Sequence, residues 1–229
     1  MNGFSQERTR KTRRMSGMTL KHVDYSVYLV TDRDLSLGRS TLEIVTAAVS
    51  GGTTIVQLRE KSANTREFIQ EALKLKAYLK KMGVPLVIND RLDVAQVVQA
   101  DGVHLGQTDL PIEMARNIVG EQMLIGISAE SLGDAIEAEK AGADYLGVSP
   151  IYATPTKTDT APPLGLEGLR QIRHSVNLPL VGIGGLNRSN AGAVIEAGAD
   201  GVAVVSAIVS ADNPELAARE LRQIVEENR

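Results

Sequence analysis

The chain lacks several features that would point to particular kinds of protein. It has 229 residues and no cysteine, which excludes disulfides, thiolate nucleophiles and Cys-ligated metals. It has no tryptophan, two phenylalanines and five tyrosines, too few rings for base-stacking platforms. No apolar run reaches the roughly 18 residues of a membrane span, and the basic N-terminus lacks the apolar core of a secretory signal. We therefore expect a cytoplasmic protein with neither a nucleic-acid nor a membrane partner.

Positive charge is scarce outside the first 22 residues. Residues 1–22 carry six Lys and Arg side chains against one Glu, which leaves a net charge of about −8 on the remainder. This segment has almost nothing to bury, so we expect a basic, disordered N-terminal extension. Contact with nucleic acid or a membrane surface is the alternative interpretation. An acidic body that binds anions must gather its few cations locally, so clustered Lys and Arg side chains are informative.

The body alternates short apolar runs with longer amphipathic runs. The expected strands are 27–30, 54–58, 86–88, 102–105, 124–127, 145–148, 180–183 and 202–205. The expected helices are 40–50, 65–81, 92–99, 112–119, 132–141, 166–174, 190–197 and 214–227. Strands without polar alternation are buried on both faces, as in parallel sheets covered by helices. Eight such units predict a single-domain (β/α)₈ TIM barrel over residues 23–229. A doubly wound sheet is the alternative, but the first strand–helix turn has no glycine fingerprint.

A partial internal repeat supports this division of the chain. The junctions 99–103, 141–145 and 197–201 each contain a small residue and an aspartate before a strand: Asp101, Asp144 and Asp200. In each copy we expect a helix to end, the chain to turn tightly and a strand to begin.

In a parallel barrel, reactive groups follow the C-terminal ends of the strands. Gln57, Arg59 and Lys61 follow the second strand, and their spacing of two aims all three the same way along an extended backbone. An Arg fork beside a Lys ammonium suits a diphosphate, and the Gln amide can read a ring edge. The alternative is a solvated charge run.

Carboxylates follow the next two strands. Asn89 and Asp90 come after the third strand and Asp109 after the fourth. Two carboxylates without cysteine or a histidine pair suit Mg²⁺ that keeps waters and shares a substrate phosphate. The alternative is helix capping, because both aspartates precede short helices.

The remaining strand ends carry hydroxyls and glycines. Ser128 follows the fifth strand. Its side chain either faces a ligand or caps the next helix, and the local sequence alone favours the cap. The loop 150–159 follows the sixth strand and contributes Thr154, Thr156 and Lys157, which suit an oxyanion. Its proline and threonine content also suggests a lid that orders on substrate binding. The run 182–185 exposes backbone N–H groups, and Val205–Ser206 again opens toward a helix.

These groups predict two anion sites, one cationic and one built from backbone amides. No activated nucleophile or general base stands out, and His104 suits a supporting or core position better than a base. This favours chemistry in which a diphosphate departs and the protein stabilises its charge.

Several motifs closely resemble the thiamine-phosphate synthase family from about Tyr28 to the C-terminus. They are Gln57–Lys61, Ile88–Arg91, Gly102–Gln107, Gly147–Tyr152 with Thr154–Lys157, and Gly182–Gly185. One departure is Leu186, where family members often have isoleucine. The resemblance implies a transferase of thiamine biosynthesis that joins hydroxymethylpyrimidine diphosphate to a thiazole phosphate. It implies a dissociative reaction, in which diphosphate leaves, the aminopyrimidine stabilises a methylene cation and the thiazole nitrogen captures it.

The resemblance also implies a role for each matched residue. Gln57 and Ser128 lie at the pyrimidine, and Asp90 and Asp109 hold Mg²⁺. The expected catalytic residues are Arg59, Lys61, Ser128 and Lys157. The expected substrate-binding residues are Gln57, Leu58, Arg59, Glu60, Lys61, Asn89, Ser128, Thr154, Pro155, Thr156, Lys157, Gly185, Val205 and Ser206. The expected partners are the two small-molecule substrates, and the sequence does not decide whether the chain forms a homo-oligomer.

Three alternatives remain. A paralogue resembling thiazole tautomerase would share the thiazole-phosphate end but lack the diphosphate-binding set. A non-catalytic phosphate-binding barrel would have no need for Asp90 and Asp109. Another phosphate-handling barrel enzyme, such as an isomerase or aldolase, would use a Schiff-base lysine inside a strand or a carboxylate base, and neither is apparent.

Overall fold

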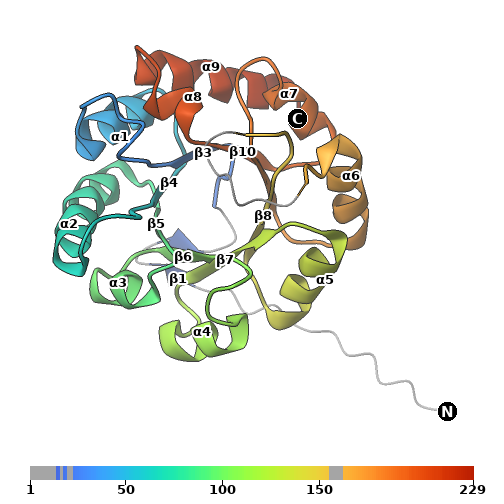
Figure 1. Cartoon of the computed structure of the whole chain (residues 1–229), viewed down its shortest axis with the longest axis horizontal. Helices are drawn as coiled ribbons and strands as arrows, with labels where there is room; N and C mark the ends of the chain where they lie inside the picture. Colours follow the sequence, from blue (N-terminus) through green and yellow to red (C-terminus); the bar gives the residue numbers. More distant parts are fainter. Residues whose placement is uncertain (1–13, 16–17, 20–22, 155–161) are drawn as a thin grey trace.

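The computed structural model describes residues 14–15, 18–19, 23–154 and 162–229. Eight parallel strands close into a barrel in the order β10-β3-β4-β5-β6-β7-β8-β9, and Figure 1 looks down its axis. The strands are β3 (Val27–Val30), β4 (Ile55–Leu58), β5 (Leu86–Asn89), β6 (Gly102–Leu105), β7 (Leu124–Ala129), β8 (Tyr145–Val148), β9 (Leu180–Ile183) and β10 (Gly201–Val204). The predicted (β/α)₈ barrel is confirmed.

The helices form a ring outside the strands (Figure 1). They are α1 (Thr41–Ser50), α2 (Thr65–Met82), α3 (Leu92–Val97), α4 (Ile112–Val119), α5 (Leu132–Ala141), α6 (Gly165–Ser175), α7 (Ala191–Glu196), α8 (Ser206–Val209) and α9 (Pro214–Glu227). Two differences from the sequence-based expectation affect the site. Strand β7 continues through Ser128 to Ala129, and a short helix, α8, follows β10 directly.

Local sequence explains where these helices begin and end. Ser40 and Glu43 form a reciprocal capping box at the start of α1. The side chain of Asn64 accepts a hydrogen bond from the N–H of Glu67 at the start of α2. The same helix ends at Gly83, whose φ of 70° is the left-handed conformation that glycine adopts without strain.

The apolar core has two parts. A larger layer lies between the strands and the surrounding helices, and Leu58, Phe68 and Leu75 belong to it. A smaller cluster includes Tyr28, Val87 and Tyr145, which project from the other face of their strands into the barrel. The barrel interior is therefore filled by side chains, and three of them, Tyr25, Tyr28 and Tyr145, carry phenolic hydroxyls.

The repeated aspartates clamp one end of the barrel. Asp101, Asp144 and Asp200 accept hydrogen bonds from a backbone N–H in the first two residues of a neighbouring strand at 2.9, 2.8 and 2.8 Å. Each also pairs with a cation, in the order Lys76, Arg116 and Arg173. The repeat predicted from the sequence therefore holds strand beginnings, at the end opposite the functional residues.

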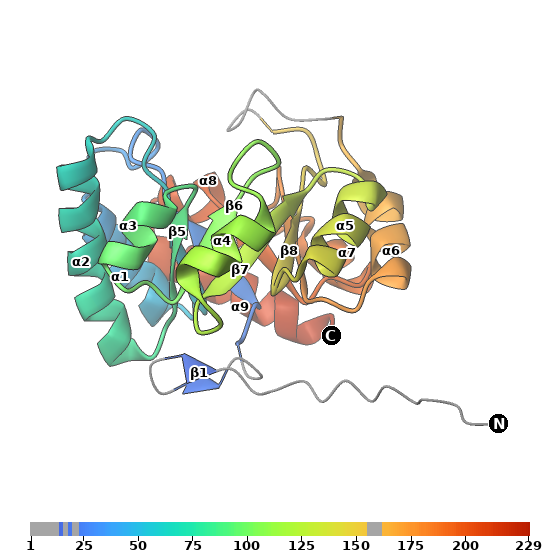
Figure 2. The same ribbon diagram turned by 90° about the horizontal axis from the view of Figure 1, so that it is seen from below.

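The N-terminal segment contributes one small feature to the described structure. Arg14–Met15 (β1) and Met18–Thr19 (β2) pair as an antiparallel ladder, and β1 lies below the barrel in Figure 2. Most of the extension 1–22 lies outside the described residues, so its expected disorder stays a prediction. In the described part of the chain, no helix combines the length and apolar character needed to span a membrane.

Candidate active site

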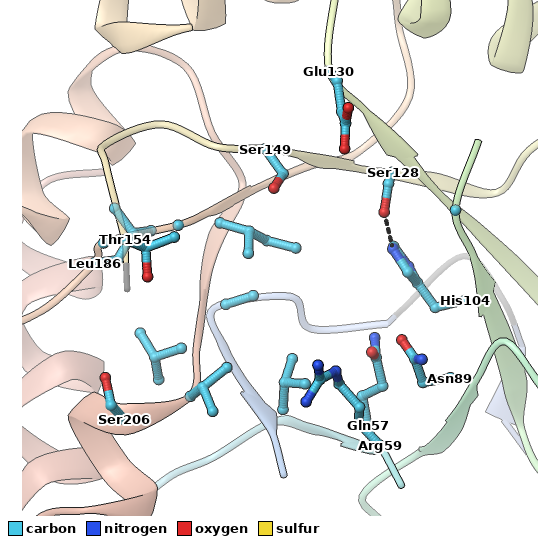
Figure 3. A pocket seen from close by; sticks show the side chains of 18 of the residues that line it. Gln57, Arg59, Asn89, His104, Ser128, Glu130, Ser149, Thr154, Leu186 and Ser206 are labelled. Atoms are coloured by element: carbon cyan, nitrogen blue, oxygen red, sulfur yellow. Dashed lines mark hydrogen bonds between the residues drawn. The ribbon is translucent and has the colours of Figure 1, made fainter. Parts of the chain in front are cut away.

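A cavity of about 700 Å³ opens where the strands end. Its lining brings together most of the predicted site residues, from strand ends spread along the chain. They are Gln57, Arg59, Lys61, Asn89, Asp90, Asp109, Ser128, Thr154, Gly185, Val205 and Ser206. Figure 3 shows Gln57, Arg59 and Asn89 together on one side, with Thr154, Leu186 and Ser206 on the other. The cavity thus has two distinct ends.

The other predicted residues are placed differently. Leu58 is fully buried in the core layer beneath the helices, and Glu60 pairs with Arg33 at 3.1 Å. Neither side chain is among those that line the cavity, so their part in substrate binding stays a prediction. Pro155, Thr156 and Lys157 lie outside the described residues, as does half of the expected lid, residues 155–159.

Arg59 is held at the cationic end by the first strand–helix loop. Its guanidinium lies 2.7 Å from a carboxylate oxygen of Asp32, and its backbone N–H donates to the hydroxyl of Thr31 at 3.0 Å. The Arg59 side chain is 21% exposed. A solvated charge run would leave it free in water, so this arrangement favours a positioned cation. Asp32 was not predicted. It follows the C-terminal end of the first strand, where functional residues are expected, but nothing else in the sequence marks it.

Lys61 and Asp90 form an ion pair at the mouth of the cavity. The ammonium nitrogen lies 3.0 Å from a carboxylate oxygen, and the lysine side chain is 60% exposed. Such an exposed pair contributes little to stability. Both groups are therefore available to an anion or a cation that enters the cavity.

Neither Asp90 nor Asp109 caps a helix by its side chain. Helix α3 begins after Arg91 and helix α4 after Pro111, each without a side-chain capping bond. Asp109 instead accepts a hydrogen bond from the N–H of Gly106 at 2.7 Å. The capping interpretation of these two carboxylates is wrong.

The carboxyl group of Asp109 lies partly buried beside that of Asp90. Burial raises the pKa of Asp109 above its ordinary value; the Gly106 N–H opposes that rise, and the nearby Asp90 carboxyl adds to it. A divalent cation would relieve this repulsion, and two carboxylates suit a hydrated Mg²⁺ that shares a phosphate. Among residues 23–154 and 162–229, no group of three or more His, Cys, Asp or Glu side chains could hold a metal. A hydrated Mg²⁺ that also binds a substrate phosphate needs few ligands from the protein.

Backbone dominates the other end of the cavity. Gly184 and Gly185 have φ values of 100° and 66°, which aim their peptide groups differently from those of a regular strand. A β-carbon on Gly185 would lie 2.7 Å from the carbonyl oxygen of Ala153. The chain after β9 therefore passes directly against the loop that carries Thr154, and Ser206 lies nearby at the start of α8 (Figure 3).

A chain of polar groups crosses the floor of the cavity. The amide of Gln57 donates to the Tyr28 hydroxyl at 2.9 Å, and that hydroxyl lies 2.7 Å from the Tyr145 hydroxyl. The two ring nitrogens of His104 lie 3.0 Å from the Tyr145 hydroxyl and 3.0 Å from the Ser128 hydroxyl. Figure 3 shows the contact between His104 and Ser128.

The hydrogen bonds of Ser128 show whether it caps a helix or faces the cavity. Helix α5 is capped by Ser131, whose side chain accepts from the N–H of Asp134. The cap interpretation of Ser128 is therefore wrong, and Ser128 lines the cavity with a side chain tied to His104. Tyr28 and Tyr145 gave no signal in the sequence, because each lies inside an apolar strand.

Comparisons with known proteins agree on one family. The family model described as thiamine monophosphate synthase matches residues 27–208. The chain is 54% identical over 209 residues to the thiamine-phosphate synthase of Chloroflexus aurantiacus, covering 91% of this chain and 96% of that one. It is 55% identical over 205 residues to that of Syntrophomonas wolfei, covering 90% and 98%.

Solved structures give the same answer. A thiamine phosphate pyrophosphorylase from Pyrococcus furiosus superimposes with a TM-score of 0.83 at 43% identity, covering 90% of this chain and 97% of the other. A 3-hexulose-6-phosphate synthase superimposes with a TM-score of 0.68 at 18% identity, which reflects the barrel fold alone.

Proposed function

Because the chain belongs to the thiamine monophosphate synthase family, we propose that its cavity binds hydroxymethylpyrimidine diphosphate at the Gln57 end and a thiazole phosphate at the Thr154 end. The chain is an enzyme, a transferase of thiamine biosynthesis that makes thiamine phosphate. The observation that carries the proposal for the substrates is that one cavity has a cationic end and a backbone-lined end.

The cationic end suits the diphosphate. Arg59 is held by an ion pair with Asp32, while Lys61 brings an exposed point charge, paired with Asp90, to the mouth of the cavity. Asn89 adds an amide that can donate a hydrogen bond. We assign Lys157 to the same group on its sequence motif. Positive charge placed before the reaction stabilises the leaving diphosphate without rearrangement during the step.

Asp90 and Asp109 would hold Mg²⁺ beside this end. The mutual repulsion of their carboxyls fits such a cation. When bound, Mg²⁺ would supply positive charge to the departing diphosphate oxygens.

The backbone-lined end suits the phosphate that stays on the product. Gly184, Gly185, Thr154 and the start of α8 line this end of the cavity, where backbone N–H groups and the Thr154 hydroxyl would donate hydrogen bonds to the phosphate. A thiazole held here would face the pyrimidine across the cavity. This arrangement would convert an encounter of two substrates into a reaction between positioned neighbours.

The reaction itself asks little of acid–base chemistry. The bond from the pyrimidine methylene to the diphosphate oxygen breaks, its electron pair leaves with the diphosphate, and the thiazole nitrogen forms the new bond. Apolar side chains, including Val30, Ile183 and Ala203, line part of the cavity, and they would limit the access of water to the electron-poor methylene.

The alternatives are less well supported. A protein resembling thiazole tautomerase would not need Gln57, Arg59, Lys61 and Asn89 around one cavity. A non-catalytic phosphate-binding barrel would not need Asp90 and Asp109.

We also propose a cytoplasmic location from the composition. The oligomeric state can be measured by size-exclusion chromatography with light scattering.

The test is to incubate the protein with both substrates and Mg²⁺ and to follow thiamine phosphate and diphosphate together. We expect equal amounts of both, and no product when either substrate is left out. Arg59→Met should abolish most of the rate, whereas Arg33→Met, which removes the neighbouring surface cation, should not. No product from a folded protein that still binds both substrates would overturn the proposal.

A further inference from the structure

The floor of the cavity contains a continuous path of hydrogen-bonding groups between Gln57 and Ser128. The path runs through Tyr28, Tyr145 and His104, and each of its four contacts is between 2.7 and 3.0 Å. Its two ends are the pocket residues assigned to the pyrimidine. Tyr28, Tyr145 and His104 lie at 1%, 1% and 5% exposure.

Space for this path is provided by two glycines. A β-carbon on Gly126 would lie 2.0 Å from Tyr145 Cζ, and one on Gly147 would lie 3.0 Å from His104 Cε1. Neither glycine has a positive φ, so both are explained by the rings that pass beside them. The path is therefore built into the packing of the barrel.

For a neutral His104, proton counting restricts the path to two arrangements. Burial raises the pKa values of Tyr28 and Tyr145 well above that of an exposed tyrosine, so both phenols keep their protons. Each phenol then has one O–H to donate, and neutral imidazole has one N–H donor and one acceptor nitrogen. Every donor in the path can be satisfied only when all the bonds run in the same direction.

In the first arrangement the bonds run from Gln57 to Ser128. The Gln57 amide N–H donates to Tyr28, Tyr28 to Tyr145, and Tyr145 to His104 Nδ1; His104 Nε2–H then donates to Ser128. The carbonyl oxygen of Gln57 is left as an acceptor for a ligand, and the hydroxyl of Ser128 is left as a donor. The Gln57–Tyr28 contact has this direction in the structure.

In the second arrangement every bond is reversed. Ser128 donates to His104 Nε2, His104 Nδ1–H to Tyr145, Tyr145 to Tyr28, and Tyr28 to the carbonyl oxygen of a rotated Gln57 amide. Gln57 now presents its NH₂ group to a ligand and Ser128 presents an acceptor oxygen. The tautomer of His104 therefore reports the direction of the whole path.

We propose that this buried path couples the hydrogen-bonding roles of Gln57 and Ser128, so that one presents an acceptor whenever the other presents a donor. The proposal rests on the proposed function for its ligand, an aminopyrimidine. An amino N–H beside a ring nitrogen is a donor next to an acceptor, which matches the first arrangement. An oxopyrimidine, with C=O beside N–H, requires the second. Tyr28, Tyr145 and His104 are thus positioning residues for recognition of the ring.

The direct test reads the tautomer of His104 without any substrate. The chain has three histidines, so ¹⁵N-histidine NMR gives few signals, and the loss of one in His104→Gln assigns it. We expect Nε2–H in the wild type. Gln57→Glu, measured at a pH where the new carboxylate is ionised, places an obligate acceptor at the far end. It should switch His104 to Nδ1–H.

The matched control cuts the path in the middle. In Gln57→Glu/Tyr145→Phe the glutamate charge remains but the bonded path does not, so His104 should keep the tautomer of Tyr145→Phe alone. Tyr28→Phe offers a second cut if the first variant does not fold. An unchanged His104 tautomer in Gln57→Glu, a doubly protonated ring, or an equal switch in the cut double variant would each overturn the proposal.

A second arm uses the reaction. Loss of one oriented hydrogen bond should raise the KM for the pyrimidine diphosphate roughly 3- to 10-fold in Tyr145→Phe. The KM for the thiazole phosphate should stay within about twofold, and inhibition by an oxopyrimidine analogue should strengthen relative to its amino counterpart. Equal changes for both substrates would refute the positioning role. Absence of thiamine phosphate from the wild type would refute the proposed function and leave the NMR result standing.

Discussion

Gly185→Ala tests whether the chain after β9 forms the phosphate end of the cavity. The residue has φ of 66°, where a β-carbon costs about 1–2 kcal/mol. Restriction of the unfolded chain by alanine offsets roughly 0.4–1 kcal/mol of that cost. The strain alone should therefore lower the free energy of unfolding by about 1 kcal/mol, which shifts Tm by about 2–4 °C for a domain of this size.

The new methyl group also meets its neighbours. It would lie 2.7 Å from the carbonyl oxygen of Ala153 and 2.9 Å from Tyr152 Cβ, so the two segments must separate. That movement displaces Thr154 and the Gly184–Gly185 amides from each other. Loss of one or two hydrogen bonds to a charged phosphate, at about 1.5–3 kcal/mol each, should raise the KM for the thiazole phosphate at least about tenfold. The KM for the pyrimidine diphosphate should change far less.

Gly83→Ala is the matched control. Gly83 has a φ of 70°, and a β-carbon added there would meet no atom within 4 Å; the residue lies at the end of α2, outside the cavity. The variant should lose only the stability that backbone strain costs, about 1 kcal/mol by thermal unfolding, with both KM values unchanged. If steady-state kinetics give Gly185→Ala the same KM for the thiazole phosphate as Gly83→Ala, our account of this end of the cavity is wrong.

Much of the site could be predicted because a parallel barrel turns order along the chain into position in space. Each strand points the same way, so Gln57, Asn89 and Asp109, which lie in or after the last residues of three consecutive strands, meet at one end. The apolar runs marked those strand ends to within two residues. For Asp90 and Asp109 the sequence left helix capping and metal binding open. Only their hydrogen-bond partners in the structure could exclude the cap.

The buried path could not be predicted in the same way. Tyr28 and Tyr145 are separated by 117 positions, and their hydroxyls meet because β3 and β8, three places apart around the barrel, both project these side chains into its interior. Nothing in either local sequence distinguishes a tyrosine that packs from one that also bonds. The cap interpretation of Ser128 is wrong for a related reason: β7 runs two residues further than its apolar run, and Ser131 caps α5.

Three further predictions address the leaving group, the barrel end and the metal. Lys157→Ala should lower kcat on the order of 10²-fold if it acts as a positioned charge, and a rate within about twofold of wild type would refute that role. Asp144→Ala removes the acceptor for Ile125 N–H and the partner of Arg116; denaturant titration should show about 2–4 kcal/mol less stability. Asp109→Asn should raise the Mg²⁺ concentration for half-maximal rate at least about tenfold, since one of two carboxylates that repel each other loses its charge. The control Asp93→Asn alters a carboxylate that is 61% exposed and paired with Arg91. An equal Mg²⁺ requirement in the two variants would remove Asp109 from the metal site.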